Sequence, residues 1–236
     1  MDLYNDDCLE KMKDLSDNSI DLLFCDLPYG ATSCKWDSLI DLNLFWKEVN
    51  RICKDTTPMF FTCSTKFGVS LINSNPKNFR YDLVWVKSAP CGFLNAKKMP
   101  MKKHEMIYVF YRKLPLYDLS SHSHKFLKEQ ENPRKEKDID TLYPNRCKVA
   151  TFNKYDPPLP NSVLEIKSQK GKHATQKPTG LIEWCLKYYS KEGDIILDPT
   201  MGSGSTGVAC KNMNRNFIGI EKDPEIYEVA INRIEV

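Results

Sequence analysis

The 236-residue sequence has no long apolar run, no signal-like start and no closely paired cysteines. No segment approaches the roughly 20 consecutive apolar residues that a membrane-spanning helix requires, which argues against a helical membrane protein. Residues 1–7 lack the basic stretch and apolar core of a secretory signal peptide. The nine cysteines are odd in number and include no Cys-x-x-Cys pair, so we expect reduced thiols in a cytoplasmic protein. The four scattered histidines form no evident metal site with them.

Charge is distributed unevenly along the chain. The net charge is +3, and 41% hydrophobic with 28% charged residues is ordinary for a globular chain. Residues 95–177, however, contain 18 Lys and Arg against 9 Asp and Glu, whereas the remainder contains 16 against 22. A basic middle region between acidic flanks fits a surface that binds a polyanion, and it fits a merely solvated basic surface about equally well.

Short β-rich apolar runs alternate with helical patterns, which predicts an α/β domain with a mostly parallel sheet. The predicted strands are Ile20–Cys25, Met59–Cys63, Asp82–Val86, Ile107–Tyr111, Ile195–Leu197 and Phe217–Ile220, with Met1–Tyr4 as a short edge strand. Several are apolar throughout, as strands covered on both faces should be. The predicted helices are Leu39–Cys53, Pro178–Tyr189, Gly204–Asn212 and Pro224–Ile234.

Residues 114–172 depart from this alternation. They contain six prolines, many charges and little clean periodicity. Because a structureless loop of that length would be unusual in a compact domain, we interpret the segment as an excursion from the sheet. The sequence leaves open whether it is a small lobe or a partly mobile segment.

A strand, a glycine-rich turn and the start of a helix are predicted across residues 194–207. Gly202, Gly204 and Gly207 fit the pattern G-x-G-x-x-G, and Glu221 follows at the end of the next predicted strand. Such glycines let the backbone turn sharply and approach a ligand, and the helix N-terminus offers free amides. An acidic residue on the next strand can accept hydrogen bonds from two ribose hydroxyls. The combination predicts a nucleoside-bearing cofactor beyond the strand ends.

The glycine pattern also fits a nicotinamide cofactor, so an NAD-dependent oxidoreductase is the first alternative. Asp198, which precedes the first glycine, weakens it. A carboxylate at this point would repel a pyrophosphate but could pair with a cationic amino group. S-adenosylmethionine offers an α-amino group and has no phosphate, so Asp198 favours this cofactor.

The apolar strand ending at Cys25 runs into a polar and aromatic turn, Asp26-Leu27-Pro28-Tyr29. Methylation of a base amino group would explain each residue. The exocyclic nitrogen is a poor nucleophile because its lone pair is delocalised into the ring, and acceptors aimed at its two N–H bonds turn that lone pair toward a methyl donor. Asp26 can supply one acceptor and the carbonyl of Leu27 the other, while Pro28 restricts the turn. Tyr29 offers a flat face on which an extruded base can stack. Taken alone, the turn would more simply be a helix cap.

Together these motifs resemble those of the β-class, permuted DNA amino-methyltransferases, the family that methylates adenine N6 or cytosine N4. The turn Asp26–Tyr29 resembles the catalytic Asp-Pro-Pro-Tyr motif, Asp198–Thr206 the Asp-Pro-Phe-x-Gly-Ser-Gly-Thr-Thr cofactor loop, and Ile218–Glu221 the ribose-binding acidic strand. Further matches are His173–Pro178, near the methionine part of the cofactor, Asn5–Glu10, near its adenine, and the short segments Trp85–Lys87 and His104-Glu105.

The resemblance implies a Rossmann-like methyltransferase fold with helices on both faces of the sheet, and a circularly permuted order with the catalytic motif before the cofactor loop. It assigns catalysis to Asp26, Leu27, Pro28 and Tyr29. Contacts with S-adenosylmethionine are implied for Asp7, Cys8, Asp26, Thr175, Lys177, Asp198, Pro199, Thr200, Gly202, Gly204, Ser205, Thr206, Glu221 and Lys222. No metal is expected.

Two positions depart from the family pattern. Leu27 stands where the family usually has a proline, which keeps the carbonyl and loses one φ restraint. Met201 stands where phenylalanine is usual beside the cofactor, and methionine can fill that space with less rigid packing. Because the carbonyl is kept, we expect activity to survive the change at Leu27.

The family pattern leaves residues 114–172 free, so we expect three segments: a catalytic half at 1–113, a target-recognition excursion at 114–172, and the cofactor-binding half of the same domain at 173–236. Two basic clusters are expected to contact DNA phosphates: Lys97, Lys98, Lys102 and Lys103, and Arg134, Lys135 and Lys137. For each of these basic residues taken singly, a solvated surface position without DNA contact is the simpler explanation.

The resemblance therefore predicts a site-specific DNA methyltransferase that acts on a flipped base. Adenine N6 is favoured because an aspartate at the start of the catalytic motif is usual for adenine in this family, whereas cytosine-N4 enzymes more often begin with serine. Cytosine N4, a non-catalytic DNA-binding partner of this fold, and methylation of RNA or of a protein glutamine are the alternatives. Whether the chain forms a homodimer is left open.

Overall fold

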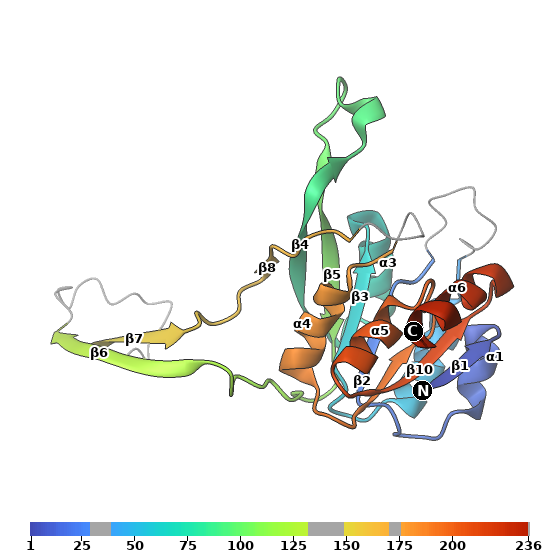
Figure 1. The fold of residues 1–236 in the computed structure, drawn as a ribbon, viewed down its shortest axis with the longest axis horizontal. Helices are drawn as coiled ribbons and strands as arrows, with labels where there is room; N and C mark the ends of the chain where they lie inside the picture. The colour runs from blue at the N-terminus through green and yellow to red at the C-terminus, as the bar shows by residue number, and fades with distance from the viewer. Residues whose placement is uncertain (29–38, 132–148, 170–175, 236) are drawn as a thin grey trace. The chain divides into compact units, whose positions relative to one another are not determined.

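The computed structural model describes residues 1–28, 39–131, 149–169 and 176–235 of the chain. Contacts divide the chain into two compact units, one formed by Met1–Tyr117 with Ser162–Val236 and the other by Asp118–Asn161 (Figure 1). The first unit holds the large sheet and its helices, and it contains every residue of the site described below.

The sheet of the first unit is mostly parallel. Its strands lie in the order β1 (Asp2–Asn5), β10 (Asn216–Glu221), β9 (Ile195–Asp198), β2 (Leu22–Cys25), β3 (Met59–Cys63), β5 (Lys102–Phe110), β4 (Phe79–Cys91) and β8 (Val163–Leu164). Neighbours from β1 to β3 are all parallel, whereas β5 runs antiparallel to both β3 and β4. The carboxyl ends of β1, β10, β9, β2, β3 and β4 therefore share one edge of the sheet.

Helices cover both faces of the sheet, as predicted. One group is α1 (Cys8–Lys11), α2 (Leu42–Ile52) and α3 (Thr65–Ser74), and the other is α4 (Thr179–Tyr189), α5 (Ser205–Asn212) and α6 (Pro224–Glu235). Figure 1 shows the second group in front of the sheet and α3 behind it. Two 3-10 turns complete the unit, η1 (Met12–Asp14) and η2 (Phe93–Asn95).

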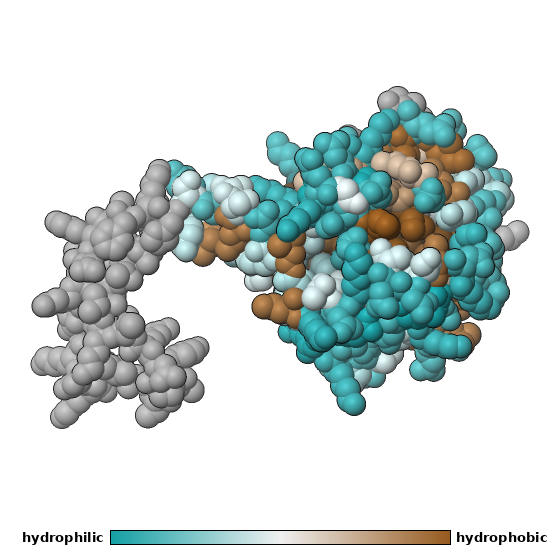
Figure 2. All heavy atoms as spheres, turned by 90° about the horizontal axis from the view of Figure 1, so that it is seen from below, coloured by the Kyte–Doolittle hydropathy of each residue, from teal (hydrophilic) through white to brown (hydrophobic). Residues whose placement is uncertain are grey.

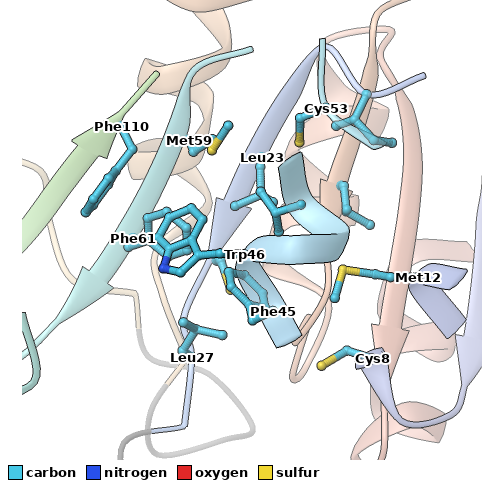
Figure 3. Close-up of a cluster of buried hydrophobic side chains, with 14 of the residues drawn as sticks. Cys8, Met12, Leu23, Leu27, Phe45, Trp46, Cys53, Met59, Phe61 and Phe110 are labelled. Carbon is cyan, nitrogen blue, oxygen red and sulfur yellow. The ribbon is translucent and has the colours of Figure 1, made fainter. Parts of the chain in front are cut away.

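The hydrophobic core lies between α2 and the centre of the sheet. Helix α2 buries Phe45, Trp46, Val49 and Ile52 on one face, and its start is capped by Asp41, whose side chain accepts the amides of Asn43 and Leu44. The ring centroids of Trp46 and Phe61 are 5.4 Å apart at 64°, an edge-to-face contact. Figure 3 shows Leu27 beside this cluster at the end of β2, so the core extends to the predicted catalytic turn.

Strands β2, β3, β9 and β10 lie within two residues of their predicted bounds, whereas the region between residues 65 and 110 differs from expectation. The expected short strands at residues 82–86 and 107–111 belong to a long hairpin, β4–β5. Helix α3 was not predicted, because Gly68 interrupts its pattern. A Cβ at Gly68 would lie 2.1 Å from the ring of Tyr108, so close packing against β5 requires the glycine.

The second unit contains β6 (Ser123–Glu131) and β7 (Val149–Asp156), which pair antiparallel. Its borders are narrower than the expected excursion, because Ser162–Gln169 join the first unit. Strand β8 pairs with β4 there, and the indole nitrogen of Trp85 donates to the carbonyl of Ile166 over 2.8 Å. The predicted role of residues 114–172 in target recognition stays a prediction.

None of the helices in the described ranges combines the length and apolar character needed to cross a bilayer.

Figure 2 views the molecule from below, and the face that it shows is mostly hydrophilic with apolar residues grouped within it.

Candidate functional site

Acidic residues gather at the shared carboxyl edge of the parallel strands. Asp26 follows β2, Asp198 ends β9 and Glu221 ends β10, and these three strands are close neighbours in the sheet. Because parallel strands deliver their carboxyl ends to one edge, residues that are distant in the sequence meet there. Asp7, which follows β1, caps α1 at the same edge through the amide of Leu9.

One cavity of about 990 Å³ unites these residues. Its walls include Asp7, Cys8, Asp26, Leu27, Pro28, Lys177, Asp198, Pro199, Thr200, Gly202, Ser205, Thr206, Glu221 and Lys222, all of which the sequence assigned to the site. The turn after β2 and the glycine loop after β9 thus face the same space. A cavity of this size can hold a nucleoside cofactor together with a base.

Asp26 is held between a hydroxyl and an ammonium group. Thr62 of β3 donates its hydroxyl to Oδ1 over 2.7 Å, and the ammonium of Lys177 lies 2.6 Å from Oδ2. The hydroxyl of Thr200 donates to the backbone carbonyl of Asp26 over 3.2 Å, which ties the two loops together. Burial raises the pKa of Asp26, and the positive charge of Lys177 opposes that rise. The carboxylate therefore has a fixed orientation while its side chain stays 29% exposed to the cavity.

Lys177 belongs to a chain of alternating charges. Its Nζ lies 3.0 Å from Oε1 of Glu105, whose other oxygen lies 2.8 Å from Nζ of Lys87. Burial alone would lower the pKa of Lys177, but Asp26 and Glu105 outweigh it and raise the pKa above its ordinary value. Burial would raise the pKa of Glu105, yet the two lysines bring it below its ordinary value. Lys177, only 10% exposed, is consequently kept cationic.

Asp198 is the most enclosed acid at the site, with only 4% of its surface exposed. Its carboxylate accepts the amide of Thr200 over 3.2 Å and the hydroxyl of Thr206. Burial raises the pKa of Asp198, and the two hydrogen bonds lower it. The effect of burial is the larger, so the pKa lies at about 7. A cationic group in the cavity would therefore stabilise its ionised form.

Gly202 and Glu221 form a further part of the cavity wall. Gly202 has φ +51°, a left-handed conformation that favours glycine, and its amide donates to Oε2 of Glu221 over 3.0 Å. The other oxygen, Oε1, accepts the amide of Asp223 over 2.8 Å. Each oxygen has two lone pairs, so Glu221 is fixed in place and can still accept hydrogen bonds from a ligand. Burial raises the pKa of Glu221.

The structure explains both departures from the family pattern. Leu27 buries its side chain in the core, 2% exposed, and burying a leucine stabilises by about 1.5–3 kcal/mol. Packing thus anchors the turn in place of a proline ring. Met201 is 4% exposed and lies over Gly219, where a Cβ would meet its sulfur at 2.4 Å. Methionine can fill this part of the cavity wall because residue 219 of β10 is a glycine, which leaves room for the sulfur.

The remaining predicted residues either fall outside the described part of the chain or do not line the cavity. Tyr29, Thr175, Arg134, Lys135 and Lys137 fall outside the described residues. Gly204 does not line the cavity: it packs against α6, where its Cβ would lie 2.9 Å from the side chain of Ile234. Lys97, Lys98, Lys102 and Lys103 are exposed on the β4–β5 hairpin, outside the cavity wall.

Sequence reasoning did not include Thr62, Lys87 or Glu105 among the site residues. A signal existed for each. Thr62 is a polar residue inside an otherwise apolar strand, and Glu105 is an acid that directly precedes the apolar end of β5. Lys87 and Glu105 lie in segments that fit the family pattern. Within the described ranges no group of His, Cys, Asp or Glu side chains is arranged to hold a metal ion.

Comparison with known sequences assigns a family. The sequence model of the DNA methylase family matches residues 20–232. The chain belongs to the DNA methylase family. It is 26% identical to the type II methyltransferase M.HinfI of Haemophilus influenzae over 97% of this chain and 66% of that protein. It is 24% identical to the type II methyltransferase M2.MboI of Moraxella bovis over 98% of this chain and 86% of that protein.

Solved structures give the same fold. The complex of M1.HpyAVI with S-adenosylmethionine matches with a TM-score of 0.66 and 25% identity, over 100% of this chain and 99% of that one. The cytosine-N4-specific PvuII DNA methyltransferase matches with a TM-score of 0.69 and 16% identity, over 98% and 85%. The predicted DNA amino-methyltransferase family, its fold and its S-adenosylmethionine-dependent reaction class are thereby confirmed, and NAD-dependent hydride transfer is not supported.

Proposed function

We propose that this methylase transfers a methyl group to N6 of an adenine in a specific DNA sequence, with Asp26 as the acceptor that orients the target amino group. The observation that carries the proposal is the fixed carboxylate of Asp26, held by Thr62 and Lys177 at the wall of a cavity that also contains Asp198 and Glu221. The preference for adenine rests on the aspartate at the start of the catalytic motif.

The proposed chemistry is mainly positioning. Bound S-adenosylmethionine would supply an electrophilic methyl group on sulfur. Asp26 and the carbonyl of Leu27 would accept hydrogen bonds from the two N–H groups of the target amine. These contacts would direct the nitrogen lone pair toward the methyl carbon. As the nitrogen–methyl bond formed and the methyl–sulfur bond broke, positive charge would develop on the nitrogen, where the adjacent carboxylate of Asp26 would stabilise it. One N–H proton would then leave the nitrogen for solvent, which gives the neutral methylated amine. Pro28 restricts the turn that brings these acceptors together.

The cavity suits the proposed cofactor in its charges. The buried carboxylate of Asp198 fits the cationic α-amino group, and the fixed carboxylate of Glu221 fits the two ribose hydroxyls. Pro199, Thr200, Gly202, Ser205 and Thr206 would line the methionine part, while Asp7, Cys8 and Lys222 would border the adenine. Lys222 is tied to Asp7 by a 3.0 Å ion pair, which fixes this part of the rim.

Duplex DNA is the proposed substrate, and the lysines of the β4–β5 hairpin are proposed to hold its phosphates. Lys97, Lys98, Lys102 and Lys103 are all exposed, and each can neutralise a phosphate. Arg134, Lys135 and Lys137 are proposed to add contacts from the excursion. We further propose that residues 114–172 read the target sequence. If exchange of this segment for that of a related enzyme leaves the methylated sequence unchanged, that role is refuted.

Nucleoside analysis tests the proposal. DNA from a host without endogenous methylation, grown with and without the protein, is digested to nucleosides and measured by mass spectrometry. N6-methyladenine that depends on the protein is expected, and N4-methylcytosine instead would support the alternative target. In vitro, labelled S-adenosylmethionine with DNA, RNA or protein separates the macromolecular substrates. Label on RNA or protein but not on DNA would overturn the proposal.

A further inference from the structure

The tip of the β4–β5 hairpin carries exposed apolar side chains. Phe93 and Leu94 are 81% and 96% exposed, which is unusual for two adjacent large apolar residues in a folded chain. Met99 and Met101 follow at 59% and 41%. All residues from 88 to 104 are exposed, so this segment contributes nothing to the core. An exposed apolar group without a role in folding points to a binding surface.

The tip has a defined backbone. Gly92, with φ +93°, starts the 3-10 turn η2, and the amides of Asn95 and Ala96 each donate over 3.0 Å to the carbonyls of Gly92 and Phe93. At the base of the hairpin, Ser88 and Ser168 exchange hydrogen bonds of 3.2 and 2.9 Å. Because the turn is already formed, ordering it on binding costs little entropy.

The hairpin rises from the cavity that holds Asp26. Residues Ser88–Cys91 line that cavity, and β4 continues past the carboxyl edge of the sheet, where Figure 1 shows its tip beyond the other strands of the unit. A macromolecule bound at the tip would therefore also lie at the entrance to the cavity.

Charge decides which partner fits the tip. Residues 87–104 contain five lysines and no aspartate or glutamate. If the tips of two copies of the chain packed against each other, their lysines would repel, whereas a polyanion would be attracted to them. An apolar wedge flanked by cations matches duplex DNA, in which phosphates border stacked bases.

We infer that Phe93 and Leu94 form a wedge that enters the base stack of the DNA beside the target and stabilises the extruded base. This inference rests on the proposed function. A base enters the cavity only after it unpairs and unstacks, and an apolar side chain that fills the vacated space offsets part of that cost. The hairpin lysines hold the phosphates, while the wedge acts on the opening step alone.

The double variant Phe93→Ser/Leu94→Ser tests the inference. Single-turnover methyl transfer at saturating DNA is measured on two duplexes that contain the methylated site, one fully paired and one with an abasic site opposite the target base. The target in the second duplex is already unpaired and needs little help to open. We expect the variant to be slower by about tenfold or more on paired DNA and within about threefold of wild type on the abasic duplex.

Matched controls distinguish a wedge from a general loss of exposed apolar surface and from a contact between two copies. Leu44→Ser/Val69→Ser also removes two exposed apolar side chains, 51% and 54% exposed on α2 and α3, and should leave both rates unchanged. An equal loss on both duplexes, or no loss on either, overturns the wedge. If the tip variant loses activity equally on both and also changes the subunit number in sedimentation, the tip is instead an interface with a second copy. Absence of DNA methylation by the wild type would refute the proposed function itself.

Discussion

The ammonium of Lys177 lies 2.6 Å from Asp26 and 3.0 Å from Glu105, so one lysine joins the predicted catalytic acid to a second carboxylate. Only an ionised Asp26 is purely a hydrogen-bond acceptor, because a protonated carboxyl would donate to the nitrogen lone pair that must attack. Lys177→Met would remove the main opposition to the effect of burial on Asp26, with only the hydrogen bond from Thr62 left, and would raise the pKa of Asp26. The acid limb of kcat should therefore move upward by roughly 1–3 pH units.

The pH profile of kcat with labelled cofactor measures this shift. Lys177→Arg retains the charge and should largely restore the profile. Lys113→Met, which removes a lysine paired with Asp55 at a distance of 2.7 Å, is the control and should change nothing. A Lys177→Met enzyme with an unshifted profile but a much weaker cofactor affinity would show that Lys177 acts as a cofactor contact instead.

Asp198 should make cofactor binding depend on pH. Its pKa lies at about 7 because burial raises it, and a bound ammonium group requires the ionised form. Below pH 7 the proton must be displaced first, so affinity falls as pH falls. Between pH 7.5 and pH 6 the dissociation constant should rise roughly tenfold, with net proton release on binding.

Isothermal titration in buffers of different ionisation enthalpy measures both the affinity and the released protons. Asp198→Asn should bind S-adenosylmethionine weakly, with little change over the same range. A wild-type affinity that does not change between pH 6 and pH 7.5 would mean that Asp198 does not pair with the cofactor amino group. A pH dependence that persists in Asp198→Asn would assign the titration to a group other than Asp198.

The hairpin lysines should affect the salt dependence of DNA binding. Lys97→Ala/Lys98→Ala should reduce the slope of log K against log salt by about 1.8, since each phosphate contact contributes about 0.9. Affinity should fall similarly for cognate and unrelated duplexes. Lys113→Ala/Lys191→Ala, at the amino edge of the sheet, is the matched control. Fluorescence anisotropy over a salt series gives the slopes, and equal slopes for both double variants would exclude these phosphate contacts.

The sequence was informative where local pattern dictates structure. Strands β2 and β3 are almost wholly apolar because both faces are covered, and the residues that follow β2 and β9 could be assigned to one edge once the sheet was predicted to be parallel. Helix α3 escaped detection because Gly68 lowers helix propensity, and only the ring of Tyr108 explains the glycine.

Contacts between distant segments could not be predicted. Lys177 meets Asp26 across 151 positions, and nothing in the local pattern of either residue indicates an ion pair. The β4–β5 hairpin was underestimated because its outer half is exposed and therefore has no apolar periodicity. Its wedge-like tip becomes visible only when the exposure of Phe93 and Leu94 is known.

Substitution of Asp26 tests the central claim most directly. Methyl transfer to adenine by Asp26→Ala is measured by nucleoside mass spectrometry, and its affinity for S-adenosylmethionine by titration. Because Asp26 is proposed to orient the amino group while Asp198 and Glu221 hold the cofactor, methylation should fall by about a thousandfold or more. The dissociation constant for the cofactor should stay within about threefold of wild type. An Asp26→Ala enzyme that methylates adenine at the wild-type rate would contradict the account.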